Sequence, residues 1–365
     1  GRSEYVNLTD GITTTFSCSV CCPNSYFDLW VNPSPGIVPL DHTKTFEAWE
    51  QDKNCFGQTL LPYQTVGQWT SSDIQIMTIH LTEGEANGET VGHVYIIVRV
   101  VAVVWYYAGH SLGCQSNTFE KIIETNADVF DIRIEVEEGR NYSNGGYVLK
   151  KNSGSETTTL TATIEGISPS GVSYIWSTGP KLSVVGSSGS STFTVKGTVK
   201  SVGKDDTYVT LVVSPPNGDQ MTDIFRMTVR EPRHFTNFDQ KGGIGSTVPL
   251  SPPMYGYITY ITYFALDQFD EVIAKTLTVT EVLQTISNPY GVEFDPPDNQ
   301  PLTVPCEPSG DLRDMLYTFS DHPLEPDYSS QRQQTFTVIG FQFPLQIQTY
   351  YSNYAIVSQA ILSRY

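Results

Sequence analysis

Trp69-Thr70-Ser71-Ser72-Asp73 begins the stretch that decides the fold. Three glycines follow it, and a long valine-rich segment comes directly after them. A second stretch of this kind starts at Tyr174 and carries Trp176. A strand that carries a Trp, followed by Ser/Gly-rich turns and paired valine-rich strands, is typical of two sheets packed face to face. Two occurrences predict a tandem array of β-sandwiches rather than a single enzyme core.

Alternation of apolar and polar residues is clearest after the second Trp-containing stretch and just before it. Threonine recurs on the outer side of these strands, which predicts one buried and one solvent-facing side. The expected buried positions are Leu160, Ala162, Ile164, Phe193, Val195, Val209, Leu211, Val213, Phe225, Met227 and Val229. We therefore expect both Trp69 and Trp176 to lie buried on core strands between two sheets.

Composition supports a secreted β-protein. Charged residues make up only 16% of the 365 residues, aromatic residues reach 12%, and the net charge is −18. The aromatic content argues against disorder, and the acidity argues against a nucleic-acid partner because no basic patch is available to neutralise phosphates. No leader precedes Gly1, so we expect a mature extracellular or cell-surface chain from which a signal peptide has been removed.

The chain divides into four segments, and the predicted fold class is all-β. These are an N-terminal arm with a Cys cluster (1–24), two sandwiches (25–130 and 131–232) and a C-terminal Tyr-rich β-domain (233–365). Aromatic residues recur in the last segment at Tyr255, Tyr257, Tyr260, Tyr263, Phe264, Phe336, Phe341, Phe343, Tyr350, Tyr351 and Tyr354. They can stack on sugar rings, but cross-strand and core packing is the more common use of aromatics in β-domains.

The segment from Val94 to Ala108 is apolar on both sides. Val94, Ile96, Val98 and Val100 share one face, and Tyr95, Ile97, Val101, Val103 and Trp105 share the other. A strand with one wet face would alternate, so we expect the third segment or another subunit to cover the second face. The run contains Arg99 and is too short for a helix that spans a bilayer, so no membrane span is expected.

Six cysteines, an even number, favour disulfides over a metal site. Cys55 and Cys114 fall in the same predicted sandwich and are the first candidates for a bridge. One further bond among Cys18, Cys21, Cys22 and Cys306 is expected to tie the arm to the body or to a neighbouring chain. Zinc would need a second Cys/His pair at a similar spacing, which the sequence lacks.

The Trp69 stretch resembles the bacterial immunoglobulin-like repeat of the group 2 type, which occurs in secreted and surface proteins. The matching residues are Trp69, Ser71, Ser72, Asp73, Gly84, Gly92, Tyr95 and Ile97. The second sandwich resembles the same superfamily more loosely, through Trp176, Gly189 and the row Val209, Leu211 and Val213. The resemblance covers roughly residues 25–232. It implies a sandwich fold and an adhesive or stalk-like extracellular role, and it implies no catalytic residues.

A Gly-x-Ser-x-Gly pentapeptide, Gly109–Gly113, is the one pattern that points to catalysis. It follows an apolar strand, as the nucleophile elbow of α/β-hydrolases does, and would make Ser111 the nucleophile. That elbow requires a helix next, whereas Cys114-Gln115-Ser116 reads as a turn. We therefore expect a hairpin turn here, no catalytic residues and no enzyme, with a secreted hydrolase using Ser111 as a remote alternative.

Other candidate sites are weaker. The six His are dispersed without metal-ligand spacing. Asp205 and Asp206, or the acids at Glu135, Glu137 and Glu138, offer oxygen ligands for calcium, but a solvated acidic edge is the more common reading. We predict no metal and no cofactor. Asn7 and Asn141 begin glycosylation sequons.

Two functions of different class follow. The first is a structural subunit of an extracellular bacterial filament or surface assembly, with copies of this chain joined through the N-terminal arm and the apolar strand Val94–Ala108. The second is an adhesin that presents the aromatic C-terminal domain to glycans. For the arm itself, folding back onto its own first sandwich is the competing expectation.

Overall fold

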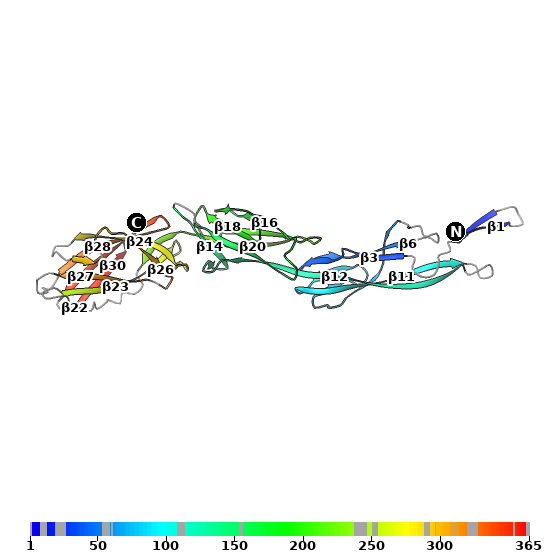
Figure 1. Ribbon diagram of the computed structural model, residues 1–365, viewed down its shortest axis with the longest axis horizontal. Coiled ribbons are helices and arrows are strands. Elements are labelled where there is room, and N and C mark those ends of the chain that lie inside the picture. Colours follow the sequence, from blue (N-terminus) through cyan, green and yellow to red (C-terminus); the bar gives the residue numbers. More distant parts are fainter. Residues whose placement is uncertain are drawn as a thin grey trace. The chain divides into compact units, whose positions relative to one another are not determined.

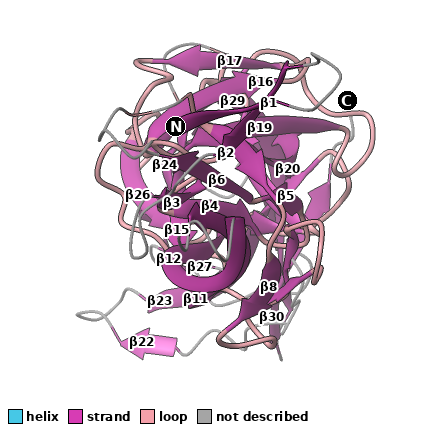
Figure 2. Ribbon diagram, turned by 90° about the vertical axis from the view of Figure 1, so that its right-hand side faces the viewer, coloured by secondary structure: helices cyan, strands magenta, loops and turns pink. Residues whose placement is uncertain are grey.

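The chain forms β-strands and no helix in the part that the structure describes (Figure 2). The structure is a computed structural model that describes residues 2–7, 13–18, 27–52, 59, 61–107, 114–152, 156–236, 247–249, 255–287, 293–295, 297–309, 311–319, 328–352 and 355–362. Because these strands form several sheets, the all-β prediction is confirmed.

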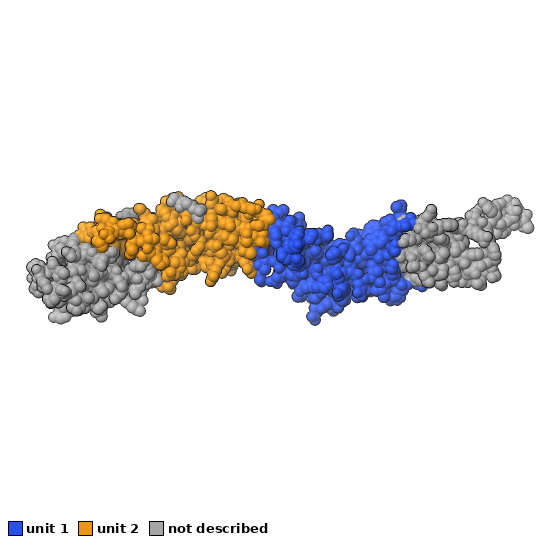
Figure 3. All heavy atoms as spheres, viewed as in Figure 1, with its two compact units in different colours: residues 1–133, 162–175, 211–223 blue, residues 134–161, 176–210, 224–365 orange. Residues whose placement is uncertain are grey.

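Two compact units divide the chain (Figure 3). The first comprises residues 1–133, 162–175 and 211–223, and the second comprises 134–161, 176–210 and 224–365. Residues 162–175 and 211–223 each contain a turn between strands of the second sandwich, and both stretches belong to the first unit. At Gly166 in one of these turns, a Cβ atom would come within 2.2 Å of the Val129 carbonyl oxygen.

The first unit contains two sheets that face each other and a smaller sheet beside them. One sheet has the order β3-β6-β7, and the second contains β8, β11, β12 and β4, the last of which pairs in parallel with β12. The small sheet has the order β5-β10-β9. Their bounds are β3 (Phe27–Asn32), β4 (Gly36–Pro39), β5 (Thr43–Thr45), β6 (Glu47–Asp52), β7 (Tyr63–Thr65), β8 (Gln68–Ser71), β9 (Met77–Ile79), β10 (Glu85–Gly88), β11 (Gly92–Tyr107) and β12 (Cys114–Val136).

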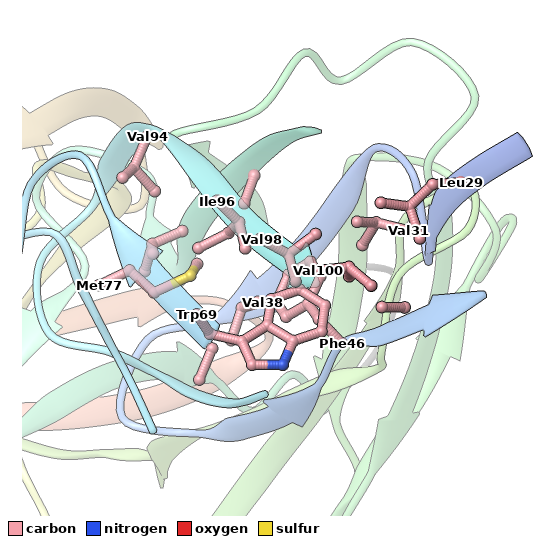
Figure 4. Close-up of a cluster of buried hydrophobic side chains, with 14 residues drawn as sticks. Leu29, Val31, Val38, Phe46, Trp69, Met77, Val94, Ile96, Val98 and Val100 are labelled. Carbon is pink, nitrogen blue, oxygen red and sulfur yellow. The ribbon is translucent and has the colours of Figure 1, made fainter. Parts of the chain in front are cut away.

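Trp69 lies in the core between these sheets, with only 4% of its surface exposed (Figure 4). Its neighbours come from both sheets and include Val31, Phe46 and Val98. The period-two alternation of β11 supplies the central row of this core, since Val94, Ile96, Val98 and Val100 are all buried. The prediction of a buried Trp69 is confirmed.

Strand β12 belongs to both units. It pairs antiparallel with β11 as far as Val129, and beyond the unit boundary it neighbours β15 (Thr158–Glu165). The Glu137 amide donates to the Thr159 carbonyl at 3.0 Å in this second stretch. Strand β12, labelled in Figure 1, thus supplies residues to both units.

The second sandwich repeats this architecture. One layer continues from β15 to β18 (Thr192–Gly197) and β17 (Leu182–Val185). The other has the order β13-β14-β20-β19-β16, and its strands are β13 (Asn141–Tyr142), β14 (Gly145–Leu149), β16 (Ser173–Thr178), β19 (Thr207–Ser214) and β20 (Met221–Arg230). Trp176 of one layer stacks on Phe193 of the other at 5.1 Å between ring centroids, and Trp176 is 4% exposed. The expected burial is confirmed here too, although Ile164 and Phe225 are only half-buried.

The C-terminal part of the second unit adds two five-stranded sheets. One has the order β21-β23-β27-β25 with β22 beside β23, and the other has the order β26-β24-β28-β29-β30. Their bounds are β21 (Pro232–Thr236), β22 (Thr247–Pro249), β23 (Tyr255–Asp267), β24 (Leu277–Ser287), β25 (Glu293–Asp295), β26 (Leu302–Cys306), β27 (Asp311–Phe319), β28 (Tyr328–Val338), β29 (Phe341–Ser352) and β30 (Ala355–Leu362). Tyr147 and Leu149 of β14 lie in one buried cluster with Phe235, Val279 and Phe336, so this domain shares a core with the second sandwich.

Candidate assembly surfaces

A groove of about 470 Å³ opens between β3 and β12 in the first unit. Eight residues line it: Leu29, Trp30, Val31, Asn32, Ser34, Ile123, Glu124 and Thr125. Along β3 these side chains alternate, because Leu29 and Val31 point into the core while Trp30 and Asn32 stay exposed. The groove therefore has apolar walls on its inner side and a polar rim.

Two strand edges border this groove. Strand β3 pairs only with β6 among the described strands, so its other edge is unpaired there. Strand β12 pairs with β11 throughout this region, and β4 occupies its opposite edge only from Ala127 onward. The Thr125 hydroxyl donates to the Ser34 hydroxyl at 2.8 Å and closes the groove at the end next to β4. Unpaired edges of this kind are templates for a further strand.

The outward face of β11 and β12 is the second candidate surface. Tyr95, Val101 and Ile122 are 46%, 53% and 56% exposed, whereas the inward row of β11 is buried. Described residues of the first unit do not cover these three side chains, so the expectation that the third segment or another subunit covers this face stays a prediction. Val103 and Trp105 belong to the predicted row but have no described side-chain environment.

An ion pair lies among the apolar residues of this face, because Arg99 stands between Tyr95 and Val101 on β11 and directly opposite Ile122 of β12. Arg99 Nε lies 2.5 Å from Glu120 Oε1, and His93 Nδ1 lies 2.6 Å from Asp128 Oδ1. Hydrogen bonding to Glu120 raises the pKa of Arg99, which keeps it charged. A face with apolar residues between charges of both signs can pack against a second copy of itself.

The N-terminal arm forms a small sheet of its own. Strand β1 (Arg2–Asn7) pairs antiparallel with β2 (Thr13–Cys18), and this sheet has no third strand among the described residues. A two-stranded sheet alone is marginally stable in water. The arm is thus a hairpin with two outer edges, and its strand β2 comes close to β11 of the same chain.

Buried arginines in the second unit form a stack with tyrosines. The Arg230 guanidinium lies 4.2 Å from the Tyr142 ring centroid and 4.7 Å from that of Tyr147, and Arg140 covers Tyr147 at 5.2 Å. Arg230 Nε is 2.5 Å from Asp267 Oδ2, and both side chains are almost fully buried. Burial raises the pKa of Tyr142 and of Tyr147, which keeps both hydroxyls protonated. Because Asp267 is the last residue of β23, this stack ties the C-terminal domain to the second sandwich.

The residues that the sequence offered for chemistry are dispersed or already paired. Asp206 bonds to Lys181 and to the Val202 amide, while Glu137 pairs with Arg140. Among the described residues there is no group of three metal-ligating side chains. The pentapeptide around Ser111 lies outside the described residues, and Asn141 is exposed on β13.

Most cysteine side chains lie outside the description. Cys306 is 2% exposed within the core of the C-terminal domain. Cys18, Cys21, Cys22, Cys55 and Cys114 have no described side-chain environment, so both expected bridges stay predictions.

Sequence reasoning missed the groove and the arginine stack. Pro33 and Pro35 gave a signal for the groove, since prolines after a strand interrupt pairing. Before these prolines the chain pairs with β6, through β3, and after them it pairs with β12, through β4. The stack had no such signal, because its members come from four strands and one turn that meet only in the folded chain.

No model of a protein family matches the sequence, and no curated protein matches it. Among solved structures, domains 4–9 of the surface layer protein SbsC are 14% identical, with a TM-score of 0.22 over 93% of this chain and 48% of that chain. A stretch of titin is 8% identical, with a TM-score of 0.22 over 93% of this chain and all of that one (100%). The three N-terminal domains of the bacteriophage RB49 outer capsid protein Hoc are 8% identical, with a TM-score of 0.25 over 87% of this chain and 94% of that one.

The neighbours include tandem immunoglobulin-like domains. At such identities and TM-scores the likeness has no bearing on function. The chain spans about half of the SbsC segment, 48%. The group 2 bacterial type expected from the Trp69 stretch stays a prediction.

Proposed function

We propose that this protein is a structural subunit of an extracellular bacterial filament or surface assembly built from immunoglobulin-like domains. The observation that carries the proposal is the exposed apolar part of the β11–β12 outward face, at Tyr95, Val101 and Ile122. Exposed apolar residues that lie close together mark interaction surfaces on soluble proteins, and here the Arg99–Glu120 ion pair lies among them.

Low charge density fits the same function. Only 16% of the residues are charged, and threonine covers the outer side of the strands, so copies can approach without burying many unpaired ions. No helix among the described residues is both long and apolar enough to cross a membrane. An extracellular location rests on this proposal and on the composition.

The adhesin function gains no support from the described aromatic residues. Phe336 is fully buried and stacks on Phe235 at 4.6 Å between centroids, and Phe341 and Phe343 are half-buried. The side chains of Tyr255, Tyr257, Tyr260 and Tyr263 lie outside the described residues. The side chains of Tyr350, Tyr351 and Tyr354 also lie outside the described residues, so the proposed glycan platform in this domain stays a prediction.

The proposal is tested with the double variant Val101→Lys and Ile122→Lys in the full chain. Light scattering and electron microscopy across a concentration series should show that the wild type assembles. This variant should need a protein concentration at least roughly thirtyfold higher, because two lost hot-spot contacts at about 1–2 kcal/mol each cost about 2–4 kcal/mol together. The matched control is Leu61→Lys with Ile74→Lys, two apolar residues of the same unit that are 88% and 69% exposed. A wild type that stays monomeric at high concentration would overturn the proposed function.

A further inference from the structure

We infer that the groove between β3 and β12 accepts strand β2 from a second copy of this chain, and that this contact joins copies head to tail. The inference rests on the proposed function and names the contact that builds the assembly. It starts from two unpaired strand edges that border one groove, in the described part of the first unit.

The groove offers what an added strand needs. Backbone groups on the free edges of β3 and β12 can pair with an inserted segment, and the walls provide apolar contacts for alternate side chains. These walls are Leu29, Val31 and Ile123, and the rim carries Asn32 and Glu124. The Ser34–Thr125 hydrogen bond closes one end, so a strand has a defined place to stop.

Strand β2 has a sequence pattern that suits this groove. It is six residues long, which is long enough to run past the four residues of β3 and the three residues of β12 that line the groove. In an extended strand Thr14, Phe16 and Cys18 share one face, while Thr13, Thr15 and Ser17 share the other. Phe16 supplies a large apolar side chain for the walls, and the threonine and serine face suits solvent.

A second copy, rather than the same copy, is the expected donor. In this chain β2 pairs with β1, and the groove is open, with Trp30 37% exposed. The hairpin gains a third and a fourth strand when it docks on another subunit, which removes its marginal stability. Donor and acceptor are different surfaces, so each copy can donate once and accept once, and the contact propagates as a filament.

The test pairs two full-length variants with opposite defects. Phe16→Asp disables the donor strand, and Ile123→Glu disables the acceptor groove. We expect each variant alone to be monomeric by light scattering, whereas an equimolar mixture forms a 1:1 dimer. In that dimer the arm of the Ile123→Glu chain fills the groove of the Phe16→Asp chain, and neither remaining surface can extend it. Ile74→Glu, an exposed apolar control in the same unit, should assemble as the wild type does.

Far-UV circular dichroism and thermal unfolding verify that both variants are folded. If either is not, a synthetic peptide of residues 11–20 is added to the wild type instead, and it should shorten the filaments and shift the fluorescence of Trp30, whereas a scrambled peptide should not. Variants that assemble like the wild type, or a peptide without effect, overturn the inference and leave the proposed function standing. A wild type that is monomeric at every concentration overturns both. A shift in Trp30 fluorescence with an oligosaccharide but not with the peptide would assign the groove to a glycan and would overturn the inference that strand β2 occupies it.

Discussion

At Asp206, burial and hydrogen bonding act on one carboxylate in opposite directions. Burial alone would raise its pKa, but hydrogen bonds from Lys181, Ser201 and the Val202 and Gly203 amides outweigh it and lower the pKa from 3.8 to about 2. The folded state therefore holds the charged form more tightly than the unfolded chain does. This stabilisation is present above the unfolded pKa and is lost as the pH falls through the folded pKa.

We predict that Asp206→Asn destabilises the protein by about 2 kcal/mol near neutral pH, which is the free energy of a shift of nearly two pKa units. The difference from the wild type should shrink between about pH 4 and about pH 2. Urea unfolding at a series of pH values measures it. Asp270→Asn is the control, since its side chain is 64% exposed. A difference that is independent of pH would show that the carboxylate charge is not the cause.

A second prediction at this scale concerns Trp176. It is 4% exposed, stacks on Phe193, and donates from Nε1 to the Ser190 carbonyl at 2.8 Å. Trp176→Ala should cost about 3–5 kcal/mol, from lost transfer free energy and the cavity left behind. Ile175→Ala next to it should change stability by less than about 0.5 kcal/mol, because Ile175 is 57% exposed. Equal effects in denaturant unfolding would argue against a Trp-centred core.

Among the elements, the turn after β15 is held by one glycine. Gly166 has φ +90, and an added Cβ would collide with the backbone of β12 at Val129. Gly186 has the similar φ of +91 but has no atom within 4 Å of the Cβ position. Comparing alanine variants at the two glycines therefore distinguishes the cost of backbone strain from the cost of a packing collision.

We predict that Gly186→Ala costs about 1–2 kcal/mol, the strain of a left-handed backbone alone. Gly166→Ala should cost at least about 1–3 kcal/mol more, because the turn must also move off β12. Thermal and urea unfolding of the two variants give the comparison. Similar losses would mean that the turn repacks without cost.

At the scale of the whole molecule, the net charge of −18 opposes any association of copies. Electrostatic repulsion between subunits is screened by salt, since the Debye length falls from about 30 Å at 0.01 M to about 8 Å at 0.15 M. We predict that assembly begins at a lower protein concentration as salt increases over this range, as light scattering can show. Weaker assembly at higher salt would mean that ion pairs between subunits, for instance from Arg99 or Glu120, outweigh the repulsion.

Particular strands show how much of the fold can be predicted from the sequence. The alternation in β11 identified its buried row, because a strand turns every second side chain to the same layer. The same alternation in β15, β18, β19 and β20 placed the second core, apart from the half-buried Ile164 and Phe225. The outward row of β11 is apolar and was expected to be covered by the third segment or by another subunit, and Tyr95 and Val101 are exposed within their own unit. Composition cannot tell a face that is covered within the chain from one that is left for a partner.

The period-two alternation of apolar residues and the residues typical of turns were thus enough to predict strands, the two buried tryptophans and the all-β class. Only the tertiary structure decided which edges stay unpaired among the described strands. Strand β3 pairs with β6 and not with β12, so the groove lies between β3 and β12 and ends at the Ser34–Thr125 hydrogen bond. The tertiary structure also decided that Arg230 is buried, since its partners Tyr142, Tyr147 and Asp267 are far apart in the sequence. A strand's own residues set its faces, but its neighbours are set by long-range pairing, which no local pattern encodes.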